Sequence, residues 1–194
     1  VIKPFEPKIK IGAVFHLASP ASPNHHSKIS YHQLPLETML VNTLGTLNLL
    51  KLAKKNRSKF LFASSSEVYG NPLEHPQRET YFGNVSPIGP RSVYDEAKRF
   101  GETLTAYFWR KYDLDARIAR IFNTYGPMMR KEDKRMIVNF IISAITNKPI
   151  TIYGDGQQTR SLCFINDMIE GLIRLMNYPK TKGEVVNLGA SEER

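Results

Sequence analysis

The sequence predicts an α/β fold with a parallel sheet, and three observations support this. Short apolar segments alternate with longer amphipathic ones along the whole chain, which is the pattern of strands joined by crossover helices. The apolar segments contain few polar residues, as expected for strands buried on both faces. Polar side chains directly follow three of them, and in a parallel sheet such positions meet at the edge where ligands bind.

The first half of the chain predicts a βαβ unit. A short apolar strand covers residues 11–18 and leads into a proline-rich loop at 19–23. Residues 37–56 carry leucine and valine at helical spacing with lysines late in the run, which indicates an amphipathic helix. A second buried strand covers 59–63 and ends at Ser64. Strand, helix and strand in this order require a parallel pair.

The middle of the chain predicts a functional loop and a long helix. Residues 71–91 form a long segment rich in proline and glycine, and loops of that length in compact domains are usually functional. Residues 93–112 contain no proline and predict a helix. A third strand is expected at 115–122, and a sharp turn at 123–127 leaves it.

The last third predicts a mixture of shorter elements. We expect a helix at 136–146, strands at 149–153, 160–165 and 185–188, and a helix that is capped by Asn166 or Asp167 and ends near Asn177. We therefore expect a first domain over residues 1–126. A second region over 127–194 would send some elements back to the first domain's sheet.

Composition narrows the class of protein. The chain has 194 residues, 41% of them hydrophobic, which suits one domain or slightly more with a real core. Cys163 is the only cysteine, so no intrachain disulfide can form and a reducing, cytoplasmic location is the expectation. No apolar run approaches the roughly 20 residues needed to cross a bilayer, so we expect no membrane partner.

The net charge and the spacing of the histidines indicate which partners and metal sites to expect. The net charge of +9 favours anionic partners such as phosphorylated small molecules. Most lysines and arginines are scattered, so we expect no nucleic-acid surface. His25, His26 and His32 have no convincing metal spacing and no cysteine or acidic cluster nearby, so we interpret them as loop histidines and expect no metal.

Two residues of the predicted long helix suggest acid–base chemistry. Tyr94 and Lys98 are four residues apart, so a helix places them on one face. A tyrosine ordinarily loses its proton near pH ~10, and a nearby ammonium favours the phenolate. A phenolate near neutral pH is a competent general base for a sugar hydroxyl. The alternative interpretation is a solvated surface pair.

Seven segments resemble the extended short-chain dehydrogenase/reductase family of NAD-dependent sugar-nucleotide epimerases and dehydratases. They occur in order at residues 16–23, 42–48, 63–70, 84–91, 94–99, 119–127 and 153–160. The resemblance implies a Rossmann-like, doubly wound parallel sheet that lacks its first strands, with part of a small C-terminal substrate-binding domain. Within the family, the chain is most similar to the members that decarboxylate UDP-glucuronate.

The resemblance implies a reaction cycle with bound NAD. Tyr94 would remove the proton from the sugar O4 while a hydride leaves C4 for NAD+, and Lys98 would hold the nicotinamide ribose and keep the tyrosine acidic. The 4-keto sugar is then a β-keto acid that loses CO2, and protonation at C5 with return of the hydride gives UDP-xylose. Ser65 would hydrogen-bond O4, and Ser66 and Glu67 would handle protons near C5 and the carboxylate.

Binding residues are implied in the same way. The cofactor would lie along Ala18, Ser19, Asn42, Ser64, Tyr94, Lys98 and Thr124. The UDP-sugar would contact Asn123, Tyr153, Arg160 and Arg135, with Tyr153 near the uracil and Arg160 on an anionic group. The family also implies a homodimer through the helix that carries Tyr94 and its neighbour.

Alternatives remain open at this point. A UDP-sugar 4-epimerase needs the same serine, tyrosine and lysine, whereas a 4,6-dehydratase would need an aspartate where Ser66 stands. A non-catalytic relative or an inactive fragment is the alternative of another class. Ser64 and Asn42 could be structural, and Arg160 could form a surface ion pair. Neither GxGxxG nor GxxGxxG occurs, so we expect the chain as given to bind NAD weakly.

Overall fold

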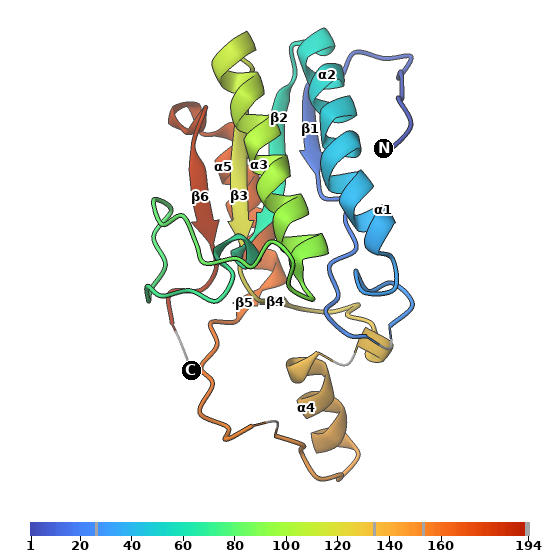
Figure 1. Ribbon diagram of the computed structural model, residues 1–194, viewed down its shortest axis with the longest axis vertical. Helices are drawn as coiled ribbons and strands as arrows, with labels where there is room; N and C mark the ends of the chain where they lie inside the picture. Colours follow the sequence, from blue (N-terminus) through green and yellow to red (C-terminus); the bar gives the residue numbers. More distant parts are fainter. Residues whose placement is uncertain (26, 134, 153, 193–194) are drawn as a thin grey trace.

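The main sheet is parallel and is the centre of the fold. The computed structural model describes residues 1–25, 27–133, 135–152 and 154–192. Its main sheet contains β1 (Ala13–His16), β2 (Lys59–Ser65), β3 (Ala116–Ile121) and β6 (Val185–Leu188), paired in the order β1-β2-β3-β6 (Figure 1). All three pairings are parallel, so the predicted fold class is confirmed.

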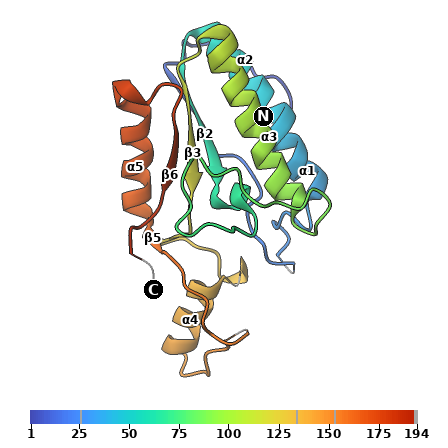
Figure 2. The ribbon, with the colours of Figure 1, turned by 60° about the vertical axis from the view of Figure 1, so that its left-hand side comes forward.

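Helices cover both faces of this sheet. One face carries α1 (Pro35–Leu40), a π-helical turn at Val41–Gly45, α2 (Thr46–Asn56) and α3 (Ser92–Tyr112). The other face is covered by α5 (Ile165–Asn177), as Figure 2 shows. The predicted helix at 37–56 thus begins two residues early, because Pro35 fits the first helical turn, and it contains a π-helical turn that the leucine spacing did not indicate.

The core has two halves because side chains alternate along β2. Phe60 and Phe62 are fully buried against α2 and α3, in a cluster with Leu50, Phe108 and Ile118. The intervening residue, Leu61, points to the opposite face and packs with Met168, Leu172 and other apolar residues of α5. Burial on both faces explains why β2 is a continuous apolar run in the sequence.

Gly101 lets α3 approach the sheet closely. A Cβ atom at this position would lie 2.3 Å from Phe62 Cζ in the core. We expect Gly101→Ala to lower the free energy of unfolding by about 1–3 kcal/mol, because a well-packed core resists added volume. Urea unfolding measures it. Gly171→Ala in α5 is the matched control, since its nearest neighbour would be 3.5 Å away; equal effects of the two variants would contradict the packing argument.

The segment between β3 and α5 extends from the carboxyl end of the sheet. It contains β4 (Thr124–Tyr125), a 3₁₀ turn at Lys131–Asp133 and α4 (Met136–Ile145), and it returns through β5 (Cys163–Phe164). β4 and β5 pair in parallel, and Figure 1 shows α4 set apart from the main sheet. Two further 3₁₀ turns are at Ser66–Tyr69 and Pro179–Thr181.

In this part, two local predictions are wrong and a third is confirmed only for part of its range. Residues 149–152 have no regular structure, and Tyr153 lies outside the described residues. The strand expected at 160–165 is only Cys163–Phe164, because pairing with β4 covers just those two residues. Phe164 caps α5 and the helix starts at Ile165, so neither Asn166 nor Asp167 is the cap. Within the described ranges, no helix is long and apolar enough to cross a membrane.

Candidate active site

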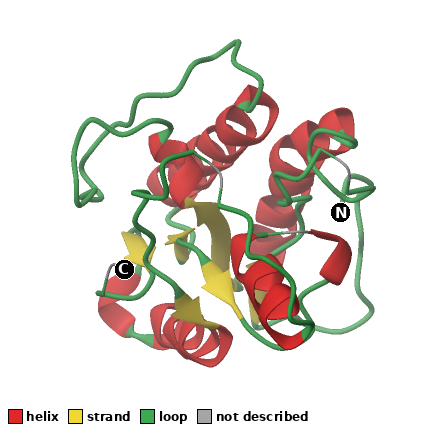
Figure 3. Cartoon of the chain, turned by 90° about the horizontal axis from the view of Figure 1, so that it is seen from below, coloured by secondary structure: helices red, strands yellow, loops and turns green. Residues whose placement is uncertain are grey.

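A cleft of about 1070 Å³ opens at the carboxyl end of the sheet. Seen from below in Figure 3, loops gather over these strand ends. Most of the predicted site residues line the cleft, namely Ser19, Ser64, Ser65, Ser66, Glu67, Tyr94, Lys98, Asn123, Thr124, Arg135 and Arg160. Tyr94, Lys98 and Ser65 therefore share one pocket.

Tyr94 is buried at the base of the cleft near the start of α3. Its side chain is 6% exposed and stacks on Tyr31, with ring centroids 5.0 Å apart. Burial raises the pKa of the Tyr94 phenol, while a hydrogen bond with Ser65 and the charge of Arg135 act in the opposite direction. The net effect is a phenol that holds its proton more firmly than a free tyrosine.

The ammonium of Lys98 points to a backbone carbonyl of β2. Its Nζ donates to the Ala63 carbonyl at 2.7 Å and lies 5.7 Å from the centroid of the Tyr94 ring. Burial lowers the pKa of Lys98 to about 7, and Glu102 opposes this shift. In this structure, burial of the Tyr94 phenol has a larger effect on its pKa than the charge of Arg135, so the expectation that Lys98 keeps the tyrosine acidic stays a prediction.

Ser65 connects the strand end to the turn that follows. It is the N-cap of the 3₁₀ turn at Ser66–Tyr69, where the backbone N–H of Glu67 donates to its Oγ at 3.3 Å. The Glu67 carboxylate forms an ion pair with Arg91, which explains how an acid can sit at this strand end. Both partners are only half-buried, so the pair remains accessible from the cleft.

Two predicted cofactor residues do not line the cleft. Asn42 is fully buried in the π-helical turn and donates its amide to Ser19 Oγ at 2.8 Å and to the Thr38 carbonyl at 2.9 Å. It therefore holds Ser19 in place. Ala18 is exposed beside Ser19 but is not part of the lining.

Arg135 joins two loops at the mouth of the cleft. Its guanidinium lies 2.6 Å from Asp133 Oδ2 and donates to the Ala21 carbonyl at 3.1 Å. Asp133 also accepts a hydrogen bond from the Ser22 hydroxyl. The proline-rich loop at 19–23 and the segment at 131–135 are thereby tied together, with Arg135 available at the rim.

Two predicted substrate residues, Arg160 and Asn123, are exposed, and the predicted cofactor residue Thr124 is half-buried. Arg160 is exposed and donates to the neighbouring Thr159 carbonyl at 2.6 Å. Asn123 uses its backbone carbonyl to accept from the Cys163 N–H at 2.9 Å, and the Thr124 hydroxyl donates to the Phe122 carbonyl at 3.0 Å.

Among the lining residues that the sequence did not single out, Arg91, Tyr31 and Asp133 carry ionisable side chains. Arg91 precedes Tyr94 by three residues, so helical spacing could have placed it near the phenol. Tyr31 and Asp133 lie in polar loops and carry no such signal. The residues that the structure describes include no group of three His, Cys, Asp or Glu side chains suited to a metal ion, and His25 instead stacks on His32.

Comparisons with known proteins agree on the family. The sequence model of the NAD dependent epimerase/dehydratase family matches residues 1–189. UDP-glucuronic acid decarboxylase 4 of Arabidopsis thaliana is 53% identical over 168 residues, which is 87% of this chain and 37% of that protein. UDP-glucuronic acid decarboxylase 1 of Xenopus tropicalis is 45% identical over 185 residues, which is 95% of this chain and 42% of that protein. The chain thus spans less than half the length of these relatives.

A solved structure of an epimerase is also similar to this chain. The UDP-glucuronic acid 4-epimerase of Bacillus cereus in complex with NAD is 28% identical and superposes with a TM-score of 0.76. The match covers 95% of this chain and 56% of that one. Because the family model spans nearly the whole sequence and the cleft carries the residues that the resemblance singled out, the chain belongs to the NAD dependent epimerase/dehydratase family.

Proposed function

We propose that the protein converts UDP-glucuronate to UDP-xylose through a 4-keto intermediate, with NAD as a tightly held cofactor. One observation carries this proposal: Tyr94, Ser65 and Lys98 line one cleft beside the Glu67–Arg91 ion pair and the cation of Arg135. Relatives that share about half of the residues bear the name UDP-glucuronic acid decarboxylase. The activity of this 194-residue chain by itself is part of the proposal.

The cleft offers donors suited to the ribose of NAD. Lys98 has three ammonium protons and one described protein acceptor, the Ala63 carbonyl, and the Ser19 hydroxyl lies on the same lining. When bound, NAD+ supplies the hydride acceptor and a positive charge at the nicotinamide ring. We infer that Lys98 and Ser19 hold the cofactor, and that Ser64 and Thr124 contribute at the strand ends.

The proposed substrate chemistry uses the residues around Tyr94. Tyr94 exchanges a proton with O4 of the sugar, and Ser65 hydrogen-bonds the same oxygen. Because the raised pKa makes the phenol hold its proton, cationic charge near the ring is needed to form the phenolate that accepts the O4 proton. Arg91 and Arg135 would hold the anionic groups of the substrate, because a guanidinium binds carboxylate and phosphate through paired hydrogen bonds.

Loss of CO2 follows from the oxidised sugar itself. A ketone at C4 is β to the C5 carboxylate, so the electron pair of the breaking C–C bond moves into an enolate. Ser66 and Glu67 would then deliver the proton that C5 receives. The sequence has no aspartate at position 66, so the acid that a 4,6-dehydratase uses to expel water is missing.

A 4-epimerase of the same substrate is the second candidate. The Bacillus cereus neighbour is titled a UDP-glucuronic acid 4-epimerase, and an epimerase needs only the serine, tyrosine and lysine that line this cleft. The two reactions share their oxidised intermediate and differ in whether the carboxylate is lost. Product mass therefore distinguishes them.

The test is incubation of the purified chain with UDP-glucuronate and saturating NAD+, followed by mass spectrometry of the nucleotide products. Saturation matters because the sequence has no glycine-rich turn to cradle the cofactor phosphates, and calorimetry with NAD+ measures the weakened binding that we expect. A UDP-pentose with release of CO2 supports the decarboxylase. A hexuronate of unchanged mass but altered C4 configuration supports the epimerase, and absence of both products contradicts the proposal for this chain.

We further propose a homodimer and a cytoplasmic location. The exposed aromatic residues Phe100 and Tyr107 of α3 suit self-association, since aromatic side chains are enriched in interfaces. Light scattering of the purified protein would report a monomer if this expectation is wrong.

A further inference from the structure

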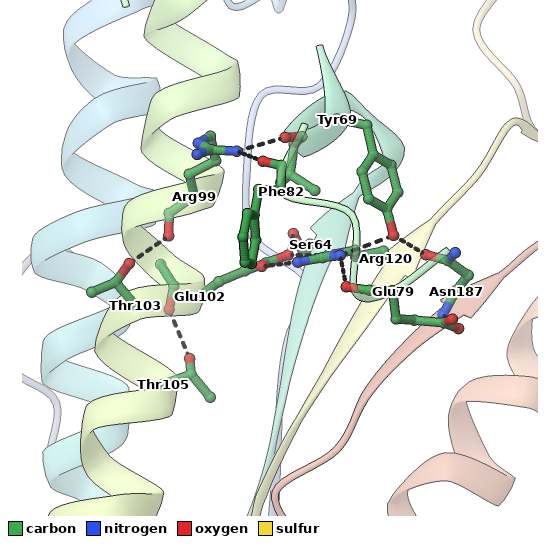
Figure 4. A network of polar contacts seen from close by, with 12 residues as sticks. Ser64, Tyr69, Glu79, Phe82, Arg99, Glu102, Thr103, Thr105, Arg120 and Asn187 are labelled. Atoms are coloured by element: carbon green, nitrogen blue, oxygen red, sulfur yellow. Dashed lines mark hydrogen bonds and ion pairs between the residues drawn. The ribbon is translucent and has the colours of Figure 1, made fainter. Parts of the chain in front are cut away.

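A buried polar network lies directly beneath the strand end that carries Ser65 (Figure 4). At its centre, Arg120 of β3 and Glu102 of α3 form a two-point ion pair, with Nε–Oε1 and Nη2–Oε2 distances of 2.9 and 2.8 Å. Their side chains are 12% and 13% exposed. The Ser64 hydroxyl donates to Glu102 Oε1 at 2.6 Å, so the carboxylate holds the residue next to Ser65.

The network reaches across three strands. Arg120 Nη1 donates to the Tyr69 hydroxyl and to the Glu79 carbonyl, both at 2.9 Å. Tyr69 in turn donates to Asn187 Oδ1 of β6 at 2.7 Å. Because every group has a partner of suitable chemistry, the network is satisfied and fixes one arrangement of β2, β3 and the loop above them.

Glu102 also belongs to the helix face that carries the catalytic candidates. Tyr94, Lys98 and Glu102 follow one another at intervals of four residues on α3, so their side chains lie on the same face of the helix. Lys98 is fully buried between this helix and the strand end. A buried ammonium needs a compensating negative charge, and Glu102 is the carboxylate whose charge reaches it.

We propose that Glu102 is a positioning residue of the site, whose Arg120-paired carboxylate holds the Ser64 hydroxyl, and with it the strand end bearing Ser65, and supplies the negative charge that Lys98 faces. Neither Glu102 nor Arg120 is expected to touch substrate. The inference rests on the proposed function only for its effect on turnover, because its effect on Lys98 is a property of the chain alone.

The surroundings of Lys98 make this effect measurable. The titratable groups near its ammonium are Tyr94 and Glu102 on α3 and His16 on β1, and the pKa of His16 is lowered to about 4 by burial and then by Lys98. His16 is thus neutral near pH 7. Arg120 on β3 shares the Glu102 carboxylate, and of these two charges it is Glu102 that acts on Lys98. Removal of the Glu102 charge should leave Lys98 without a compensating anion.

The test is a pH titration of Lys98 by NMR of ¹³C-labelled lysine side chains in the full chain. The parent should titrate near 7, and Glu102→Gln should lower the midpoint by roughly one pH unit. Glu96→Gln is the matched control, because Glu96 is on the same helix and contacts Arg99 at 3.7 Å; it should leave the midpoint unchanged. A Glu102→Gln midpoint equal to that of the control would overturn the proposal.

Two further variants keep the test decisive. Should Glu102→Gln fail to fold because Arg120 loses its partner, the double variant Glu102→Gln/Arg120→Gln removes both charges, and the Lys98 midpoint should still fall. Ser64→Ala keeps the carboxylate and removes only its hydroxyl donor, so it should leave the midpoint unchanged. Ser64 is also a proposed cofactor contact, so kcat is measured at saturating NAD+, where full occupancy of the cofactor site leaves the displaced strand end as the cause of a lower kcat. Unaltered kcat in Ser64→Ala would overturn the strand-end role. If the parent shows no turnover, the proposed function fails, while the titration still decides the charge role.

Discussion

Tyr94→Phe is expected to lower kcat for UDP-glucuronate turnover by about 10²–10⁴-fold, the usual contribution of a positioned acid–base group. The substitution removes only the hydroxyl and keeps the ring that stacks on Tyr31. The hydroxyl forms a hydrogen bond with Ser65 and lies within the electrostatic influence of Arg135. Steady-state kinetics at saturating NAD+ and substrate measures the loss.

Tyr107→Phe is the matched control for this variant. Tyr107 lies on the same helix, is 48% exposed and contacts the Tyr112 hydroxyl at 3.5 Å, away from the cleft. It should retain the parent's kcat, and both variants should unfold at nearly the parent's urea concentration. A Tyr94→Phe protein with undiminished turnover would show that another group handles the O4 proton.

The fold could be predicted largely because its strands are buried on both faces. β2 appears in the sequence as an apolar run at 59–63 and forms a strand over Lys59–Ser65. Residues 149–152 also look like a strand but have no regular structure, and Ile152 is 63% exposed. A β-rich composition forms a strand only where a neighbour pairs with it, and a single sequence does not reveal that neighbour.

The site could be predicted in position but not in electrostatics. Spacing correctly brings Tyr94, Lys98 and Ser65 to one cleft, because four-residue helical spacing and parallel strand ends are local rules. The direction of the Tyr94 pKa shift depends on how deeply the ring is buried, which only the tertiary packing sets. Partners such as Asp133 for Arg135 are likewise contacts across loops that no local pattern encodes.

Lys98→Met is expected to abolish turnover and to stabilise the fold. The pKa of Lys98 falls from 10.5 to about 7, and this difference corresponds to roughly 5 kcal/mol of penalty for carrying the charge in the folded state. Methionine has similar length and no charge, although the Ala63 carbonyl then loses its donor at a cost of about 1–3 kcal/mol. The net gain in the free energy of unfolding near neutral pH should be roughly 2–4 kcal/mol.

The pH dependence of this gain in stability shows whether it comes from removal of the buried ammonium or from better apolar packing of the methionine. The depressed pKa means that the unfolded chain binds the proton more readily than the folded one between about pH 7 and 10.5. The penalty is therefore complete below pH 7 and disappears as pH rises through 10.5, so urea unfolding should show a larger gain at about pH 6 than at about pH 9. Lys51→Met, at an exposed position on α2, should change stability by less than about 0.5 kcal/mol at either pH. A pH-independent gain in Lys98→Met would mean that apolar packing, rather than relief of a buried ammonium, stabilises the variant.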